Sequence, residues 1–87
     1  MATVFIPPLI RDLTGGQTKV SIPGESVQEV IDELETRFPG ISGRLCEDGR
    51  IRPGMSVFVD NEISTLGLRQ RLSGDSEVHF LPAISGG

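Results

Sequence analysis

The most constraining feature of the sequence is a single amphipathic helix. Ser26 is a favourable N-cap, and Glu29 follows three residues later, which is the signature of a capping box. Pro39-Gly40 then ends the segment. The apolar residues between these signals fall on one helical face, at Val27, Val30, Ile31, Leu34 and Phe38. A helix with one apolar face must bury it, and the surrounding segments indicate that its partner is a sheet.

Four segments have the β-branched and aromatic composition of strands: residues 2–6, 18–22, 56–60 and 77–81. Asn61-Glu62 is predicted as a tight turn, with Ile63-Ser64 as a short edge strand after it. The segments between these are predicted as an apolar loop at residues 9–13, a loop with one short helical turn at residues 40–54, and a short helical segment at residues 66–72. The expected fold is therefore one α+β domain, with a mixed sheet of four to five strands and one main helix on one face.

Alternation along the strands assigns residues to the two faces of the sheet. The face under the helix is expected to hold Val4, Ile6, Val57, Val59, Val78 and Phe80. The opposite face is expected to hold Thr3, Phe5, Phe58, His79 and Leu81. An open face that carries several large apolar side chains predicts a patch for docking a partner, formed by Phe5, Phe58, His79 and Leu81. The alternative is that the segment at residues 8–13 or at residues 40–54 folds over them.

Composition excludes several classes of function. A net charge of −4 disfavours nucleic acid as a partner, because phosphate binding needs a basic surface. No apolar run approaches a membrane span, and no signal peptide is visible, so we expect no membrane association and a cytoplasmic location. One cysteine, Cys46, and one histidine, His79, are too few for a typical zinc site, so no metal is expected. No nucleophile–base pair is evident either, so we expect that the chain is not an enzyme.

Three segments carry a resemblance to a known family. They are Val4-Phe5-Ile6-Pro7 leading to Leu13-Thr14-Gly15-Gly16, the helix of residues 26–38 followed by Pro39-Gly40-Ile41, and residues 74–87, which end in Gly86-Gly87. This pattern resembles the ubiquitin-like β-grasp fold, and more closely the ThiS/MoaD-type sulfur-carrier family. The ending looks most similar to the branch that supplies sulfur for cysteine biosynthesis. Ser73 departs from the Asp that molybdopterin synthase small subunits have at this turn.

The resemblance implies a β-grasp domain at residues 1–82 and a flexible tail at residues 83–87. In that family an adenylating enzyme of the ubiquitin-activating type uses ATP to join the terminal carboxylate, here that of Gly87, to AMP. A sulfur donor then converts the adenylate to a thiocarboxylate. The carrier finally docks on an acceptor enzyme, which would be a cysteine synthase or the large subunit of molybdopterin synthase. Ile84, Ser85 and Gly86 would thread the tail into these partners.

The residue types at the tail suit this chemistry. Gly87 has no Cβ to hinder attack on its carbonyl, and Gly86 makes the tail thin and conformationally free. The free carrier is expected to be a monomer that binds no cofactor itself. Other readings remain open: a molybdopterin synthase small subunit, a ubiquitin-like protein modifier conjugated through Gly87, or an interaction domain whose tail is inert. Cys46 is read as a bystander thiol, because only Arg44 is near in sequence to lower its pKa.

Overall fold

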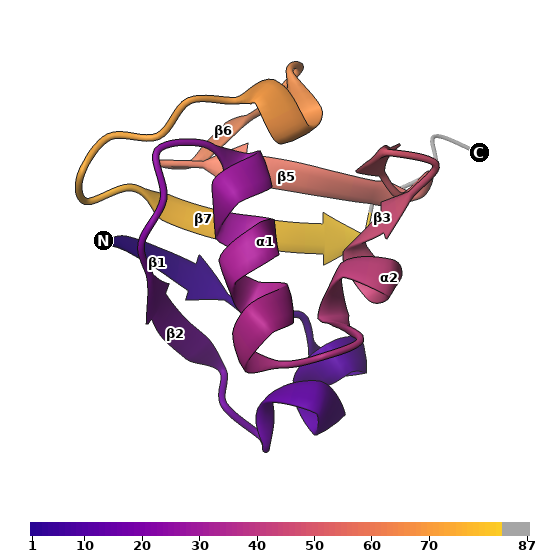
Figure 1. Cartoon of the computed structure of the whole chain (residues 1–87). Coiled ribbons are helices and arrows are strands. Elements are labelled where there is room, and N and C mark those ends of the chain that lie inside the picture. Colours follow the sequence, from indigo (N-terminus) through magenta and orange to yellow (C-terminus); the bar gives the residue numbers. More distant parts are fainter. Residues whose placement is uncertain (83–87) are drawn as a thin grey trace.

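The computed structural model describes residues 1–82, and its main feature is a five-stranded mixed sheet (Figure 1). The strand order is β2-β1-β7-β5-β6. The central pair, β1 and β7, is parallel, and every other neighbouring pair is antiparallel. The strands are β1 (Ala2–Phe5), β2 (Lys19–Ile22), β5 (Met55–Val59), β6 (Glu62–Ile63) and β7 (Glu77–Pro82). The predicted fold class and all four main strands are confirmed.

Helix α1 (Val27–Arg37) lies across one face of this sheet (Figure 1). The Ser26 hydroxyl accepts a hydrogen bond from the Glu29 N–H at 3.2 Å, as the predicted cap requires. The other half of the capping box differs from expectation, because the Glu29 carboxylate accepts from the Glu25 N–H at 3.0 Å. Ser26 and Arg71 lie opposite each other in an isolated β-bridge, in which the Val27 N–H donates to the Gln70 carbonyl at 2.9 Å and the Leu72 N–H to the Glu25 carbonyl at 3.0 Å. The start of the helix is therefore tied to the segment ahead of β7.

The core lies between α1 and the sheet, and it has the composition that alternation predicts. Val4, Ile6, Val57, Val78 and Phe80 are all buried beneath the apolar face of the helix. Val59 was expected among them but is only half-buried, because it is the last residue of β5 and lies beside an exposed turn. The core of this small domain is built mainly by α1 and the three central strands, and Ile10, Ile22, Ile41 and Leu45 from the segments around them complete it.

The connection after β1 is not the loop that its composition suggests. It forms a 3₁₀ helix, η1 (Pro8–Thr14), which has a proline in its first turn and ends at Gly15 with a φ of 66°. Ile10 is buried in the core, whereas Leu9 is 79% exposed. The Thr14 hydroxyl donates to the carbonyl of Gln17 at 3.0 Å, which closes the segment. Buried contacts and this local closure order a connection that the sequence alone leaves undefined.

Residues 40–54 contain the predicted helical turn together with a hairpin that was not predicted. The turn is the short helix α2 (Ile41–Leu45), which packs against α1. A hairpin follows, formed by β3 (Cys46–Glu47) and β4 (Arg50–Ile51). Its two central residues, Asp48 and Gly49, have φ values of 54° and 76°. Asp-Gly is a favoured pair for a two-residue hairpin turn, so the signal was present in the sequence.

Two smaller segments complete the described chain. The turn between β5 and β6 is made by Asp60 and Asn61, with φ values of 51° and 71°, one residue earlier than predicted. Asp and Asn both tolerate the left-handed conformation that such a turn requires, so Asp60 and Asn61 occupy its two central positions. Glu62 is then the first residue of the edge strand. The predicted short helical segment is the 3₁₀ helix η2 (Gly67–Arg69), which contacts α1. Among residues 1–82, no helix has the length and apolar character to cross a membrane.

Glu35 joins the two helices electrostatically, and this connection predicts a pH effect. Its carboxylate accepts hydrogen bonds from the Gly40 N–H at 2.9 Å and the Ser42 N–H at 2.8 Å. These bonds, the one from Gly40 first, lower the pKa of Glu35. A lowered pKa in the folded state contributes stability that is present at neutral pH and is lost as the pH falls through that pKa. We expect Glu35→Gln to destabilise the fold at neutral pH and to have a smaller effect in acid.

Denaturant unfolding at neutral pH and well below the ordinary pKa of a glutamate carboxyl measures this difference. Glu33→Gln is the matched control. The Glu33 carboxylate lies 3.2 Å from the Arg37 guanidinium, one helical turn along α1, so this variant removes an exposed ion pair instead of hydrogen bonds from backbone N–H groups. An equal destabilisation by Glu35→Gln at both pH values would contradict the assigned role of the two backbone hydrogen bonds.

Candidate functional site

A continuous row of side chains crosses the face of the sheet opposite α1. Strand register places Phe5 beside His79, and His79 beside Phe58. Lys19 pairs with Phe5 at one end of this line, and Ile63 pairs with Phe58 at the other. Residues paired directly across strands share a face of the sheet. The open-face row is therefore Lys19, Phe5, His79, Phe58 and Ile63, one residue from each of the five strands.

The central part of the open-face row is preorganised by stacking. The rings of Phe5 and His79 lie parallel, with centroids 4.0 Å apart and an interplanar angle of 6°. Both side chains are half-buried, as is that of Phe58. Two adjacent rings held in this way form a rigid surface that loses little conformational entropy on binding.

Leu81 completes the predicted docking patch, two residues beyond His79 on the same strand, and it is 42% exposed. A shallow pocket of about 190 Å³ lies between Phe5, His79, Leu81 and the first residues of η1. The η1 segment therefore borders this face without burying it, and α2 packs against α1 on the other side. The structure thus brings Phe5, Phe58, His79 and Leu81 together on an accessible face.

Sequence reasoning missed the two ends of the open-face row. Lys19 is the only lysine of the sequence and is exposed on strand β2. Ile63 is 58% exposed on the edge strand β6. Alternation within a strand predicts which face of the sheet a residue occupies. It does not predict which residues of the other strands lie beside it, because that depends on strand order and register. The two ends add a cationic and an aliphatic group to the aromatic centre.

The C-terminal tail starts from the middle of the sheet. Strand β7 lies between β1 and β5, and its last residue, Pro82, pairs with Met55 at the beginning of β5. Leu81 precedes this point, so the docking patch and the start of the tail are adjacent. The predicted sulfur-carrying residue Gly87 and the predicted threading residues Ile84, Ser85 and Gly86 lie outside the described residues. Their roles therefore remain predictions from the sequence.

Cys46 is the one thiol among residues 1–82, and its surroundings do not activate it. Burial raises the pKa of the half-buried Cys46 thiol, and the negative charge of Asp32 adds to this effect. The thiolate that sulfur chemistry would need is therefore disfavoured, as expected for a bystander. Within residues 1–82, His, Cys, Asp and Glu side chains form no group of three or more that could hold a metal.

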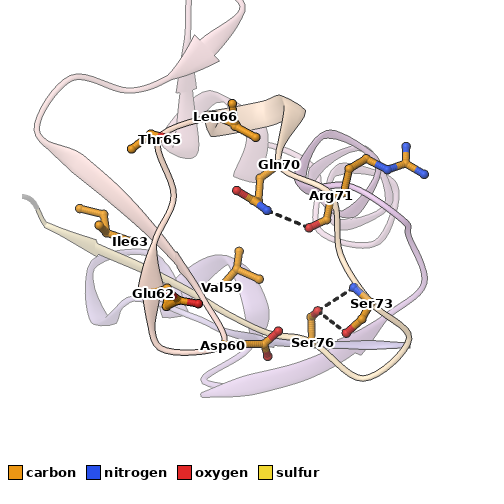
Figure 2. Close-up of a pocket in the computed structure, with 10 residues that line it drawn as sticks. All are labelled: Val59, Asp60, Glu62, Ile63, Thr65, Leu66, Gln70, Arg71, Ser73 and Ser76. Atoms are coloured by element: carbon orange, nitrogen blue, oxygen red, sulfur yellow. Dashed lines mark hydrogen bonds between the residues drawn. The ribbon is translucent and has the colours of Figure 1, made fainter.

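A polar pocket of about 440 Å³ lies at the other end of the sheet, between β6 and the segment that leads into β7 (Figure 2). Several of the polar groups around it are engaged in hydrogen bonds or an ion pair. The Ser76 hydroxyl accepts from the Ser73 N–H at 2.8 Å, and the Gln70 amide donates to the carbonyl of Arg71 at 3.0 Å (Figure 2). The Arg71 guanidinium pairs with Glu25 at 3.4 Å. These bonds shape the connection into β7, and we assign the pocket a structural role.

Together, the helix-covered mixed sheet and its accessible row of side chains define a ubiquitin-like β-grasp protein. Comparison with known proteins identifies the family. The model of the ThiS family matches residues 4–87, which is nearly the whole chain and includes its last residue. The chain belongs to the ThiS family.

Individual relatives agree with this assignment. The sulfur carrier protein CysO of Mycobacterium tuberculosis is 36% identical over 90 aligned positions, which cover 98% of this chain and 97% of the relative. The small archaeal modifier protein 3 of Haloferax volcanii is 33% identical over 64 positions, covering 71% and 70% of the two chains. Among solved structures, a chain of the Amycolatopsis orientalis BexX/CysO complex superposes with a TM-score of 0.91 at 34% identity, covering 100% of both chains. These relatives are named as carriers and modifiers, and the chain is likewise not an enzyme.

Proposed function

We propose that this protein is a sulfur carrier whose C-terminal Gly87 carries the sulfur as a thiocarboxylate, and that it supplies this sulfur for cysteine biosynthesis. The observation that carries the proposal is the extent of the family match, which includes Gly87. The relative CysO, named as a sulfur carrier protein, aligns over 98% of this chain. The position of Pro82 at the end of the central strand supports it, because the tail begins there, directly after Leu81 of the docking patch.

The proposed cycle begins with a partner enzyme that uses ATP. An oxygen of the Gly87 carboxylate attacks the α-phosphate of ATP, pyrophosphate leaves, and a mixed anhydride with AMP forms. A sulfur nucleophile from a donor then attacks the carbonyl carbon, and AMP leaves with the bridging oxygen. The Gly87 carbonyl is unhindered, since glycine has no Cβ. The finished thiocarboxylate passes to an acceptor enzyme in the cytoplasm, for which a cysteine synthase is our first candidate.

In this proposal the predicted docking patch holds the carrier while a partner works on Gly87. The BexX/CysO complex, in which a related carrier is part of an assembly, supports the expectation that such carriers bind partner enzymes. Phe58 lies on β5, next to the central strand, between His79 and Ile63 in the open-face row. A large aromatic side chain at the centre of an interface commonly contributes more binding free energy than the contacts around it.

We expect Phe58→Asp to leave the protein folded and to weaken its activation by the adenylating enzyme by at least about tenfold, because it would bury a charge in the interface. The measurement is the carrier concentration dependence of ATP–pyrophosphate exchange, with folding checked by circular dichroism. Glu62→Gln, on the edge strand but paired with Val59 on the opposite face of the sheet, is the control and is expected to have little effect. Activation of Phe58→Asp at the rate of the unmodified carrier would refute the patch.

Intact-mass analysis tests the proposed function itself. The carrier is incubated with ATP, its adenylating enzyme and a sulfur donor. Exchange of one oxygen for sulfur, located at Gly87 by fragmentation, is the expected result. An unchanged mass with every candidate adenylating enzyme would overturn the proposal and favour an inert tail.

A second function, as a protein modifier, is favoured by one comparison, the match to small archaeal modifier protein 3 over 71% of this chain. In that case Gly87 would acylate the amine of a target lysine. The same mass experiment, performed with a cell extract as the source of targets, would then give conjugates of higher mass joined through an isopeptide bond to Gly87. Their absence, together with thiocarboxylate formation, would leave sulfur transfer as the function.

A further inference from the structure

We propose that a surface notch at the carboxyl end of β7 is the seat for the side chain of Ile84, in the C-terminal segment of this same chain. The notch has a volume of about 360 Å³ and is lined by residues 7–10, residues 52–55 and Arg44. Its surface is mainly aliphatic, from prolines and from Leu9, Ile10 and Met55. Leu9 is 79% exposed here, which leaves an uncovered apolar surface on the helix side of the domain.

The two walls of the notch flank the end of β7. Residues 7–10 continue the chain beyond β1, which is parallel to β7. Residues 52–55 lead into β5, which is antiparallel to β7 on its other side. Pro82, the last described residue, pairs with Met55, which is itself part of one wall. The chain beyond Pro82 therefore begins at the edge of the notch.

The alternation of β7 selects Ile84 as the occupant. Val78 and Phe80 face the helix side of the sheet and are buried there. An extended chain repeats its orientation every two residues, so residue 84 would have the same direction as Phe80. The notch opens on this side, since Ile10 belongs to the core and Arg44 comes from α2. Two extended residues span up to about 7 Å, which suffices to bring Ile84 from the edge into the notch.

Charge complementarity supports the same occupant. Arg44 and Arg52 lie at the notch, in a protein whose net charge is −4. Their partners are Asp12 at 3.8 Å and Glu47 at 3.5 Å, and these ion pairs are largely exposed to solvent. Three residues separate Ile84 from the Gly87 carboxylate, a reach of up to about 10 Å. The guanidinium groups would attract that carboxylate while Ile84 occupies the aliphatic part.

Seating Ile84 would restrict the base of the tail, and the notch arginines would draw the Gly87 carboxylate toward the same surface. A partner enzyme that takes up the tail would first have to release it from the notch. The alternative occupant of the notch is an apolar side chain of a partner protein, with carboxylates on either side of it that would pair with Arg44 and Arg52. The position of Pro82 and the alternation of β7 favour the chain's own tail.

Methyl-group NMR on the full chain, without any partner enzyme, tests the proposal. We expect Ile84→Ser to shift the methyl resonances of Leu9, Ile10 and Met55, and Ala83→Ser, in the opposite phase, to leave them unchanged. A nuclear Overhauser contact between the Ile84 and Leu9 methyl groups is the expected direct observation. Because no sulfur transfer is involved, the result is independent of the proposed function.

Three results would overturn the assignment. The notch resonances of Ile84→Ser could match those of the unchanged chain. They could depend on protein concentration, which would make a second copy the occupant. The notch resonances could shift only when an adenylating enzyme is added, by the same amount in the unchanged chain and in Ile84→Ser. That result would make the partner enzyme the occupant of the notch.

Discussion

A chain that ends at Ser85 is expected to form thiocarboxylate more than about 100-fold more slowly than the unchanged chain. The reason is that even a small displacement of a reacting group lowers the rate of an enzymatic reaction strongly. Deleting Gly86 and Gly87 moves the terminal carboxylate back by about 7 Å along an extended chain. It also places the carboxylate on a residue that carries a Cβ, next to the carbonyl that sulfur must attack. Intact-mass analysis with ATP, adenylating enzyme and sulfur donor measures the effect.

The matched control keeps the length of the tail. Ala83→Ser retains both terminal glycines and the threading residues, and it is expected to react at close to the rate of the unchanged chain. The deletion lies beyond β7, so both variants should unfold at the same denaturant concentration as the unchanged protein. Thiocarboxylate formation by the shortened chain at a comparable rate would show that the terminal glycines are not the reactive element.

Phe80→Ala is expected to destabilise the fold by about 3–5 kcal/mol, the range typical of removing a buried phenylalanine ring. Phe80 is 1% exposed, lies on the central strand, and is among the largest fully buried side chains. A domain of this size has a free energy of unfolding of only about 4–13 kcal/mol, so the variant would lose a large share of it. Denaturant unfolding followed by circular dichroism gives the change directly.

Phe58→Ala is the control for the same side chain in the opposite environment. Phe58 lies on the neighbouring strand β5, but it faces the open side and is half-buried. Its truncation removes less buried surface and should cost clearly less than truncation of Phe80. Equal losses for the two variants would contradict the assignment of the two faces of the sheet.

The parts of the fold that could be predicted are those specified by local patterns. The helix carries its own cap and its own apolar periodicity, from Ser26 to Leu34, so neither depends on distant residues. Alternation in β7 separates Phe80 from His79 without any knowledge of the partner strands. Such features can be read from the chain because each follows from neighbours a few residues away.

The missed parts depend on contacts between distant segments. The 3₁₀ helix η1 is held in place by the burial of Ile10, which nothing in its own segment specifies. The hairpin of β3 and β4 had a readable Asp48-Gly49 turn, but its strands are only two residues long, too short to show alternation. The contributions of Lys19 and Ile63 to the open-face row follow from strand order alone. The tail residues are a sequence prediction throughout.

The parallel pairing of β1 with β7 also affects how the protein is made. The ribosome completes the central strand last, although the first strand and the hairpin after it are among the first segments to emerge. Before β7 is synthesised, no strand lies between β1 and β5. The apolar face of the helix then has no central strand to pack against. Contacts between such distant segments slow folding, since a long loop must close before they can form. The nascent chain therefore cannot complete the middle of its sheet before β7 has been synthesised, so its stable fold forms only after all the other described strands are already made.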